Sequence, residues 1–257
     1  MISKSKNNKK RKSYGDDHDS GISKDKGFDR DAWKPKTELG KKVKAGDITN
    51  LDQILDRGLS LLESEIVDML LPDLQVDLME VGQSKGKFGG GKKSIWRQTQ
   101  KKTKEGNKPS FATVAVCGDN NGYIGIGFGK AKETVPAREK AIRRAKLNII
   151  KVKRGCGSWA CGCKGAHSIP FTVKGKCSSA TFELMPAPKG TKLCMERECQ
   201  KLLKLAGVKD VYGKTRGQTR SKLNVVYACF AALKQLTKVK VKSEQIENLG
   251  IIGGRNE

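Results

Sequence analysis

Alternation of apolar and other residues marks the best-defined part of the chain. It runs over residues 111–116 and resumes over residues 123–128, after a turn at Asn121 and Gly122. An Asn-Gly pair tolerates the positive φ angles of a tight turn, so the pattern predicts a β-hairpin. Glycine recurs at every second position of the returning strand, as Gly125, Gly127 and Gly129. Because one strand face is then bare of side chains, we expect the next element to pack closely against it.

The segment from Thr134 to about Lys151 has helical spacing. Its two faces are apolar and basic, with Val135, Ile142, Ala145 and Ile149 on one and Lys140, Arg144 and Lys151 on the other. Thr134 is suited to cap the start, and Pro136 is tolerated in a first turn. The sequence therefore predicts a strand-strand-helix unit whose helix is apolar inward and basic outward. The alternative for the basic face is ordinary solvation.

A second α/β layer is predicted toward the C-terminus. Alternation indicates half-buried strands over residues 171–174 and 179–184, then a turn at residues 185–192. Beyond it we expect a helix that ends at Gly207, a strand over residues 208–212, and a final helix. The apolar positions of the two helices are Cys199, Leu202, Leu203 and Leu205, then Leu223, Val226, Tyr227, Phe230 and Leu233. Such stripes are typical of a core, not of a ligand site.

The N-terminal part changes character at about Trp33. Residues 1–34 are polar, so we expect a flexible tail. Its cations Lys9, Lys10, Arg11 and Lys12 contact RNA backbone or simply keep the tail solvated. Residues 49–58 and 64–74 indicate two short helices, the first capped by Thr49 or Asn50 and the second stopped by Pro72. We interpret them as a clamp on the following domain.

Composition points to a polyanionic partner. The 257 residues suffice for two modest domains, but only 36% are hydrophobic and 5% aromatic, so the cores are small. Lys and Arg outnumber Asp and Glu by 52 to 27, a net charge of +25. Nucleic acid neutralises such a charge through phosphate contacts, and an anionic membrane surface is the competing partner. No apolar run approaches the ~20 residues of a membrane span, and no signal peptide is evident. We expect a cytoplasmic protein without a membrane partner.

Residues 81–108 carry the densest positive charge outside the tail. The cations are Lys85, Lys87, Lys92, Lys93, Arg97, Lys101, Lys102, Lys104 and Lys108. Phe88 and Trp96 lie between them, and each can stack on a base, which is worth ~1 to 3 kcal/mol. We expect this segment to become ordered on RNA. The alternative is a disordered glycine-rich loop without a specific role.

Eight cysteines in a chain without an export signal favour thiols or metal ligands over disulfides. Cys117, Cys194, Cys199 and Cys229 lie among apolar residues and are expected to fill the core. Cys156, Cys161, Cys163 and His167 follow the spacing C-x4-C-x-C-x3-H, and they supply the number of ligands that a tetrahedral zinc site needs. This spacing is not that of a standard zinc knuckle, and Cys177 is a possible substitute ligand. Free thiols in a glycine-rich linker are the alternative.

Enzyme signatures are missing from the sequence. The segment PAPKGT lacks the order of a phosphate-binding loop, and GIGFGK lacks the spacing of a dinucleotide-binding turn. The chain has only two histidines, so no general base is evident beside a Ser or Cys. We therefore expect no catalysis.

Several segments resemble one known family. GDNNGYIGIGFGKAKE, AKLNII and RGCGSW, the N-terminal WKPKTELGKKVKAGDITNLDQIL, and VKGKCSS, LMPAPKGT and LAGVKDVYGKTRGQTR are similar to the fifth small-subunit ribosomal protein family in its archaeal form. The resemblance covers residues 33–249. An insertion around GKFGGGKKSIW departs from the commoner family pattern.

The resemblance implies an α+β fold. It consists of a β-β-β-α domain like those that bind double-stranded RNA, then a β-α-β-α domain with a left-handed crossover, with a helical N-terminal extension and a basic tail. Accordingly, we divide the chain into a tail (1–34), an extension (35–75), a first domain (76–155), a Cys/His-rich linker (156–169), a second domain (170–240) and a C-terminal tail (241–257).

The resemblance also implies a function. The protein would be a structural constituent of the small ribosomal subunit, bind ribosomal RNA near the channel through which mRNA enters, support accuracy, and contact mRNA and family members four and eight. Besides the cations of residues 81–108, the candidate contacts are Lys140, Arg144, Lys174, Lys176, Lys189, Lys214, Arg216, Arg220 and Lys222. Two alternatives are a free-standing RNA-binding or chaperone-like protein and, by shared fold of the second domain alone, a metabolite kinase.

Overall fold

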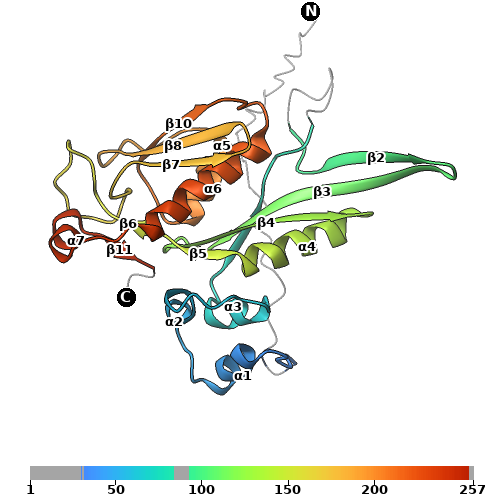
Figure 1. The fold of residues 1–257 in the computed structure, drawn as a ribbon, viewed down its shortest axis with the longest axis horizontal. Helices are drawn as coiled ribbons and strands as arrows, with labels where there is room; N and C mark the ends of the chain where they lie inside the picture. Colours follow the sequence, from blue (N-terminus) through green and yellow to red (C-terminus); the bar gives the residue numbers. More distant parts are fainter. Residues whose placement is uncertain (1–29, 31, 84–92, 255–257) are drawn as a thin grey trace, which may run out of the picture.

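The computed structural model describes residue 30, residues 32–83 and residues 93–254. Figure 1 shows three tiers. The lowest holds helices α1 (Glu38–Ala45), α2 (Leu51–Asp56) and α3 (Glu65–Leu70), the middle holds the first sheet with α4 (Thr134–Leu147), and the upper holds the second sheet with α5 (Arg197–Leu205) and α6 (Lys222–Lys238). Each helix in the described ranges is too short or too polar to cross a lipid bilayer.

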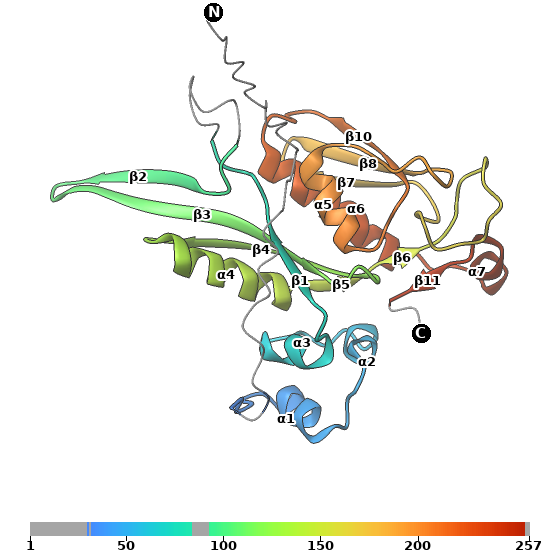
Figure 2. The ribbon, with the colours of Figure 1, turned by 180° about the vertical axis from the view of Figure 1, so that it is seen from behind.

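The first sheet is antiparallel and is built on one long strand. Its strands are β1 (Gln75–Leu78), β2 (Arg97–Thr103), β3 (Gly106–Gly118), β4 (Tyr123–Ala131) and β5 (Ile149–Lys151). The first half of β3 pairs with β2 and the second half with β1 along the same edge, while β4 pairs along the other edge. The β2–β3 hairpin therefore extends beyond the rest of the sheet, and both views show it projecting from the body (Figures 1 and 2).

Helix α4 packs directly on the glycines of β4, as predicted. A Cβ atom added at Gly125, Gly127 or Gly129 would lie 2.2, 2.2 or 2.0 Å from a carbonyl oxygen of α4. Real Cβ atoms do not approach backbone so closely, so any side chain here would push the helix off the sheet. The period-two glycines thus fix the distance between helix and strand. The hairpin turn is also confirmed, with positive φ angles at Asn120 and Gly122.

The two faces of the first sheet belong to two different cores. Val114, Val116, Ile124 and Ile126 are buried in a cluster with the second domain. Ala115, Cys117 and Tyr123 point the other way, into a cluster with α4 and the N-terminal helices. Because successive side chains of a strand point to opposite faces, the two strands serve both cores at once.

The N-terminal helices clamp the first domain, as expected. Ile54 and Ile66 are fully buried in the cluster that includes α4. Ion pairs fasten the same contact, with Lys146 of α4 lying 2.7 Å from Asp68 and Lys151 of β5 lying 2.9 Å from Asp52. Helix α3 ends at Leu70, before Pro72, and Asn50 is the N-cap residue of α2, although its side chain makes no capping bond. Sequence analysis missed α1, whose start is capped by Thr37.

Three expectations about α4 are wrong. Val135 is 63% exposed instead of buried, because the buried face consists of Ala137, Ala141, Ile142 and Ala145. Glu133, not Thr134, is the N-cap residue, and its side chain makes no capping bond. The helix also ends at Leu147, so Ile149 and Lys151 lie on β5. Ala137, Ala141 and Ala145 of that face lie directly against the glycines of β4.

The second domain is a four-stranded sheet with α6 against β7 and β8. The strand order is β7 (Val173–Cys177), β8 (Ala180–Pro186), β10 (Val211–Arg216) and β9 (Leu193–Cys194). β9 and β10 are parallel and are connected through α5. The predicted helix stripes are core: Cys199, Leu202, Leu203, Val226, Phe230 and Leu233 are buried. The strand expected at residues 208–212 begins only at Val211.

The C-terminal segment closes over the linker, which sequence analysis missed. Helix α7 (Ser243–Leu249) is followed by β11 (Ile252–Gly253), which pairs with β6 (Lys153–Arg154). The N–H of Cys156 donates to the carbonyl of Leu249 at 2.8 Å. The start of the linker is thus held between the two domains by residues almost 100 positions later in the chain.

Candidate nucleic-acid interface and metal-binding cluster

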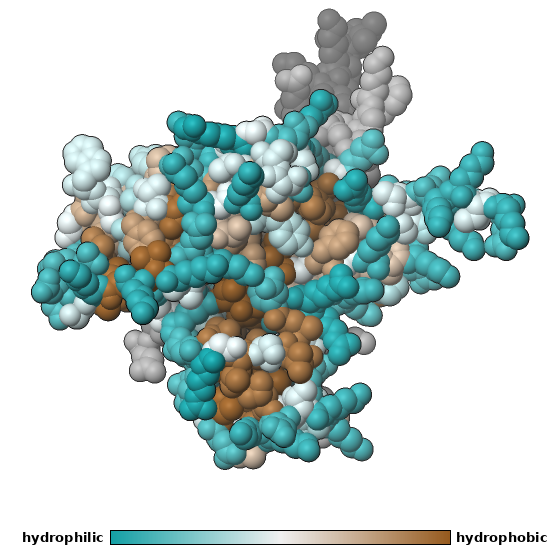
Figure 3. Space-filling view, viewed as in Figure 1, coloured by the Kyte–Doolittle hydropathy of each residue, from teal (hydrophilic) through white to brown (hydrophobic). Residues whose placement is uncertain are grey.

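The β2–β3 hairpin gathers five of the predicted RNA contacts. Arg97, Lys101, Lys102, Lys104 and Lys108 all lie on its two strands or on their connection. All five are exposed, and the one acidic neighbour, Glu105, forms an exposed ion pair with Lys108 at 3.2 Å. Figure 3 shows hydrophilic side chains over this projecting arm and apolar ones gathered over the N-terminal helices. The hairpin therefore holds these five cations away from the core of the protein.

The remaining contacts predicted in the basic segment do not join the hairpin. Lys85, Lys87, Lys92 and Phe88 lie outside the described residues. Lys93 and Trp96 are half-buried. Burial and the neighbouring Lys222 lower the pKa of the Lys93 ammonium, so this residue faces the second domain. The ammonium of Lys222 lies 2.5 Å from a carboxylate oxygen of Glu196, so its charge is already paired within the protein.

A second group of predicted contacts meets on the open face of the second sheet. The register places Lys174 and Lys214 on either side of Glu183, and it places Lys176 and Arg216 on either side of Thr181. These four cations are exposed, whereas Gly175, between Lys174 and Lys176, faces α6. Strand alternation therefore places the cations opposite the helix. We call Lys174, Lys176, Lys214 and Arg216 the open-face cations.

Other predicted contacts are scattered. Lys140 and Arg144 are exposed on α4, and the Arg144 guanidinium donates to the carbonyl of Phe128 at 2.8 Å. Arg220 is exposed just before α6. Lys189 lies in the loop after β8, outside the strands of the open face. The predicted set is therefore not a single surface but two concentrated areas with outliers.

The Cys/His set predicted for zinc converges in space. The ligand atoms of Cys156, Cys161, Cys163 and His167 lie within 4.8 Å of one another. The stems of the linker bring them together, because Gly155 pairs with Ser168 in an antiparallel bridge and places Cys156 near His167. Cys161 Sγ lies 3.8 Å from His167 Nε2. Cys177, the substitute ligand considered from sequence, is not among the four.

The thiols of this cluster differ in acidity. Burial raises the pKa of Cys156 to about 11. The backbone N–H of Lys189 stabilises the thiolate of Cys161 and lowers its pKa to about 6. Three sulfurs and one imidazole form a closed four-ligand set, as structural zinc sites require. The residues therefore fit a tetrahedral soft metal in number, type and proximity.

The other predicted core cysteines divide. Cys117, Cys199 and Cys229 are buried, as expected. Cys194 is exposed on β9, so that expectation is wrong. Burial raises the pKa of the Cys117 thiol to about 12, which makes it a poor nucleophile or ligand.

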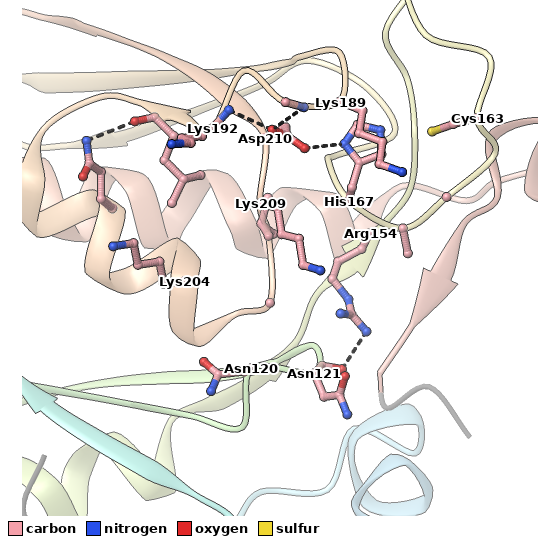
Figure 4. A pocket seen from close by; sticks show the side chains of 17 residues that line it. Asn120, Asn121, Arg154, Cys163, His167, Lys189, Lys192, Lys204, Lys209 and Asp210 are labelled. Atoms are coloured by element: carbon pink, nitrogen blue, oxygen red, sulfur yellow. Dashed lines mark hydrogen bonds and ion pairs between the residues drawn. The ribbon is translucent and has the colours of Figure 1, made fainter.

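A basic cleft of about 1060 Å³ adjoins the metal-binding cluster. Figure 4 shows its lining, to which both domains contribute. Its cations are Arg154, Lys189, Lys192, Lys204 and Lys209. The guanidinium of Arg154 is buried and donates to the carbonyls of Asn121 and Gly254 at 2.8 and 3.0 Å. We call this volume the interdomain cleft.

Sequence analysis missed most of this cleft and one exposed aromatic. Of the five cleft cations only Lys189 was predicted. Lys192 lies in the same loop as Lys189, and the other three come from α5, from the segment after it and from β6. Trp159 is 99% exposed between Cys156 and Cys161. The only signal for it in the sequence was its place inside the cysteine motif. A fully exposed Trp is unusual in a packed protein.

The sequence is similar to known proteins over both domains. The family models described as "Ribosomal protein S5, N-terminal domain" and "Ribosomal protein S5, C-terminal domain" match residues 95–153 and 175–247. The chain is 48% identical over 222 residues to "Small ribosomal subunit protein uS5" of Nanoarchaeum equitans, covering 86% of this chain and 95% of the relative. It is 46% identical over 228 residues to the protein of the same name from Methanocaldococcus jannaschii, covering 89% and 98%.

Proposed function

From the premise that this chain belongs to the ribosomal protein S5 family, in its archaeal form, we propose that it binds ribosomal RNA near the channel through which mRNA enters the small subunit and supports accurate decoding. Membership itself makes the chain a structural constituent of the small subunit, ribosome-bound in the cytoplasm, and not an enzyme. The proposal concerns where it binds and what that binding does.

The open-face cations carry the argument for ribosomal RNA. Four exposed positive side chains stand in two rows across three strands, while the other side of the sheet is covered by α6. Such a flat cationic surface suits phosphates of a folded RNA more than the edges of particular bases. Neighbouring small-subunit proteins, including family members four and eight, are proposed partners for the remaining surface.

The β2–β3 hairpin supports the mRNA contact. It projects from the body and bears five exposed cations against one carboxylate. A projecting arm reaches a strand that passes beside the protein, and its lysines bind phosphates without sequence preference. Lys93, although predicted with these residues, lies against the second domain, so we place the mRNA contact at Arg97, Lys101, Lys102 and Lys104 instead.

The test uses reconstituted small subunits that carry the full chain. Replacing Lys101, Lys102 and Lys104 with Gln should slow the opening of structured mRNA and raise misreading, because the arm loses three phosphate contacts. A matched control replaces Lys34, Lys36 and Lys41, which are equally exposed on the N-terminal part. Normal unwinding and accuracy in the hairpin variant would refute the mRNA role. Loss of subunit assembly in the control variant alone would refute the assignment of RNA binding to the hairpin instead of the N-terminal part.

We further propose that Cys156, Cys161, Cys163 and His167 hold a structural zinc ion. When bound, the metal cross-links the two ends of the linker. The observation that supports it is the convergence of four ligand atoms within 4.8 Å from a spacing that is not a standard knuckle. Purified full-length protein should contain close to one zinc per chain, and Cys161→Ser should lose it. Metal analysis showing no stoichiometric metal would remove the zinc proposal and leave the RNA proposal untouched.

A further inference from the structure

We propose that Asp210 is a positioning residue that joins the metal-binding cluster to the basic loop 188–192, so that metal binding and the ordering of this loop stabilise each other. The inference rests on the zinc site proposed above. It concerns a residue outside the Cys/His motif, on a segment more than 40 positions after it in the sequence.

The first observation in support is that the two oxygens of the Asp210 carboxylate have different partners. Oδ2 lies 2.9 Å from His167 Nδ1. Oδ1 accepts from the backbone N–H groups of Gly190 and Lys192 at 3.1 and 2.7 Å. Asp210 is buried, so these three contacts are its main interactions. Figure 4 shows the carboxylate between the histidine ring and the loop.

The hydrogen bond fixes the tautomer of His167. A carboxylate accepts, so Nδ1 must carry the proton and donate. Nε2 then keeps its lone pair, and it is the nitrogen that lies 3.8 Å from Cys161 Sγ, on the side of the thiols. Metal-bound histidines usually donate their other ring N–H to such a partner, which orients the ring and raises its basicity.

Backbone contacts make the arrangement stiffer. The carbonyl of His167 accepts from the N–H groups of Lys209 and Asp210 at 2.9 and 3.0 Å. Histidine and carboxylate are therefore held by main chain as well as by side chain. A rigid second partner of this kind loses little entropy when the metal binds.

The loop 188–192 contacts both Cys161 of the cluster and Asp210. The backbone N–H of Lys189 approaches Cys161 Sγ, while those of Gly190 and Lys192 are bound to Asp210. Lys189 and Lys192 also line the interdomain cleft, together with His167 and Asp210. A bound metal would fix Cys161 and His167, and the loop contacts Cys161 directly and His167 through Asp210. Metal and loop are thus coupled, and the coupling acts in both directions.

The first experiment compares metal affinity in full-length protein, using Co²⁺ as a spectroscopic probe in competition with Zn²⁺. Asp210→Asn should weaken binding by about 10- to 100-fold. If the amide oxygen stays on the loop, its NH₂ group faces Nδ1 and favours the tautomer that cannot ligate through Nε2. Glu183→Gln is the matched control, since it makes the same carboxylate-to-amide change on the open face beside Lys174. This variant should bind metal as the wild type does.

The second experiment needs no variant, in case Asp210→Asn does not fold. The chain has two histidines, so ¹⁵N-histidine labelling gives two sets of ring signals, with His18 as the internal reference. In zinc-loaded protein, His167 should show a protonated Nδ1 and a metal-bound Nε2. Amide exchange at Gly190 and Lys192 should accelerate at least about tenfold when the metal is chelated.

The outcomes separate the two proposals. A wild-type protein that binds no metal would remove the zinc site and this inference with it. Stoichiometric metal in the wild type with unchanged affinity in Asp210→Asn would overturn the role of Asp210 alone, as would a metal-bound Nδ1. Unchanged exchange at Gly190 and Lys192 after chelation would overturn the coupling to the loop.

Discussion

The two sheets use the same packing device but leave different surfaces. In the first sheet α4 lies on the glycines of β4, and in the second α6 lies on Gly175 of β7, where a Cβ would come within 2.1 Å of the carbonyl of Ala228. The first sheet is covered on both faces, by the N-terminal clamp and by the second domain. The second keeps one face open, and there the cations gather. The first sheet is therefore a support, except for its projecting hairpin, and the second is the platform on which we propose that RNA binds.

The largest effect should come from disturbing the support. Gly127→Val should destabilise the full chain by about 3 kcal/mol or more, because its Cβ would meet backbone of α4 at 2.2 Å and both cores depend on this sheet. Urea denaturation measures the change. Ala45→Val is the control, since this residue is exposed at the end of α1. Equal stability of the two variants would contradict the close-packing argument.

The next effect concerns the platform. Replacing the four open-face cations with Gln should leave stability nearly unchanged, but it should reduce the salt dependence of binding to small-subunit RNA by a slope of about 3, at ~0.7 to 0.9 per phosphate contact. Binding titrations over a range of salt concentrations test this. The control variant replaces Lys34, Lys36, Lys41 and Lys42, an identical change in net charge. An equal loss in both variants would mean that total charge, not this face, determines affinity.

A smaller, pH-dependent effect is expected where the two regions meet. Glu198 of α5 is buried and accepts from the N–H of Glu80 at 2.9 Å. Burial raises the pKa of Glu198 above its usual 4.5. A carboxyl with a raised pKa in the folded chain favours folding below its usual value, and this contribution is lost as the pH rises through the raised value.

Glu198→Gln removes that titration. Relative to the wild type, the variant should therefore gain stability as the pH rises, by on the order of 1 kcal/mol or less. Urea midpoints at about pH 4 and about pH 8 provide the comparison. A difference between the two proteins that does not change with pH would show that Glu198 keeps its ordinary acidity in the folded protein.

The smallest effect belongs to the tip of the hairpin. Glu105→Gln breaks an exposed ion pair with Lys108, so the stability change should stay within about 0.5 kcal/mol. RNA affinity should rise slightly, because Lys108 is then available to phosphate. A clear loss of stability, measured by the same denaturation, would show that the hairpin is more than an appended arm.

Local patterns predicted the elements well. The alternation of residues 111–128 and the glycine period indicated β3, β4 and the close helix, because each depends on neighbours in sequence. The clustering of Cys156, Cys161, Cys163 and His167 was also accessible, since the ligands lie within 12 positions. Val135 was expected to be buried because it is apolar and shares a helix face with Ile142, but it lies in the first turn of α4 and is exposed. The domain limits and RNA contacts proposed from sequence stay predictions.

Long-range relations were beyond the sequence. The rows formed by Lys174 with Lys214 and by Lys176 with Arg216 depend on strand register across 40 positions. No proposed metal ligand lies near Asp210 in the sequence, so its contact with His167 could not be predicted. Helix α7 and β11 have weak apolar patterns, and they exist because β6 and Cys156 offer them backbone partners.

The pairing of β11 with β6 has a consequence for how the protein is made. Arg154 needs the carbonyl of Gly254, and Cys156 needs that of Leu249. Gly254 follows Arg154 by 100 positions, and both acceptors lie beyond the second domain in the sequence. These bonds therefore cannot form until the second domain has been synthesised, so the join between the two halves closes only when both are present.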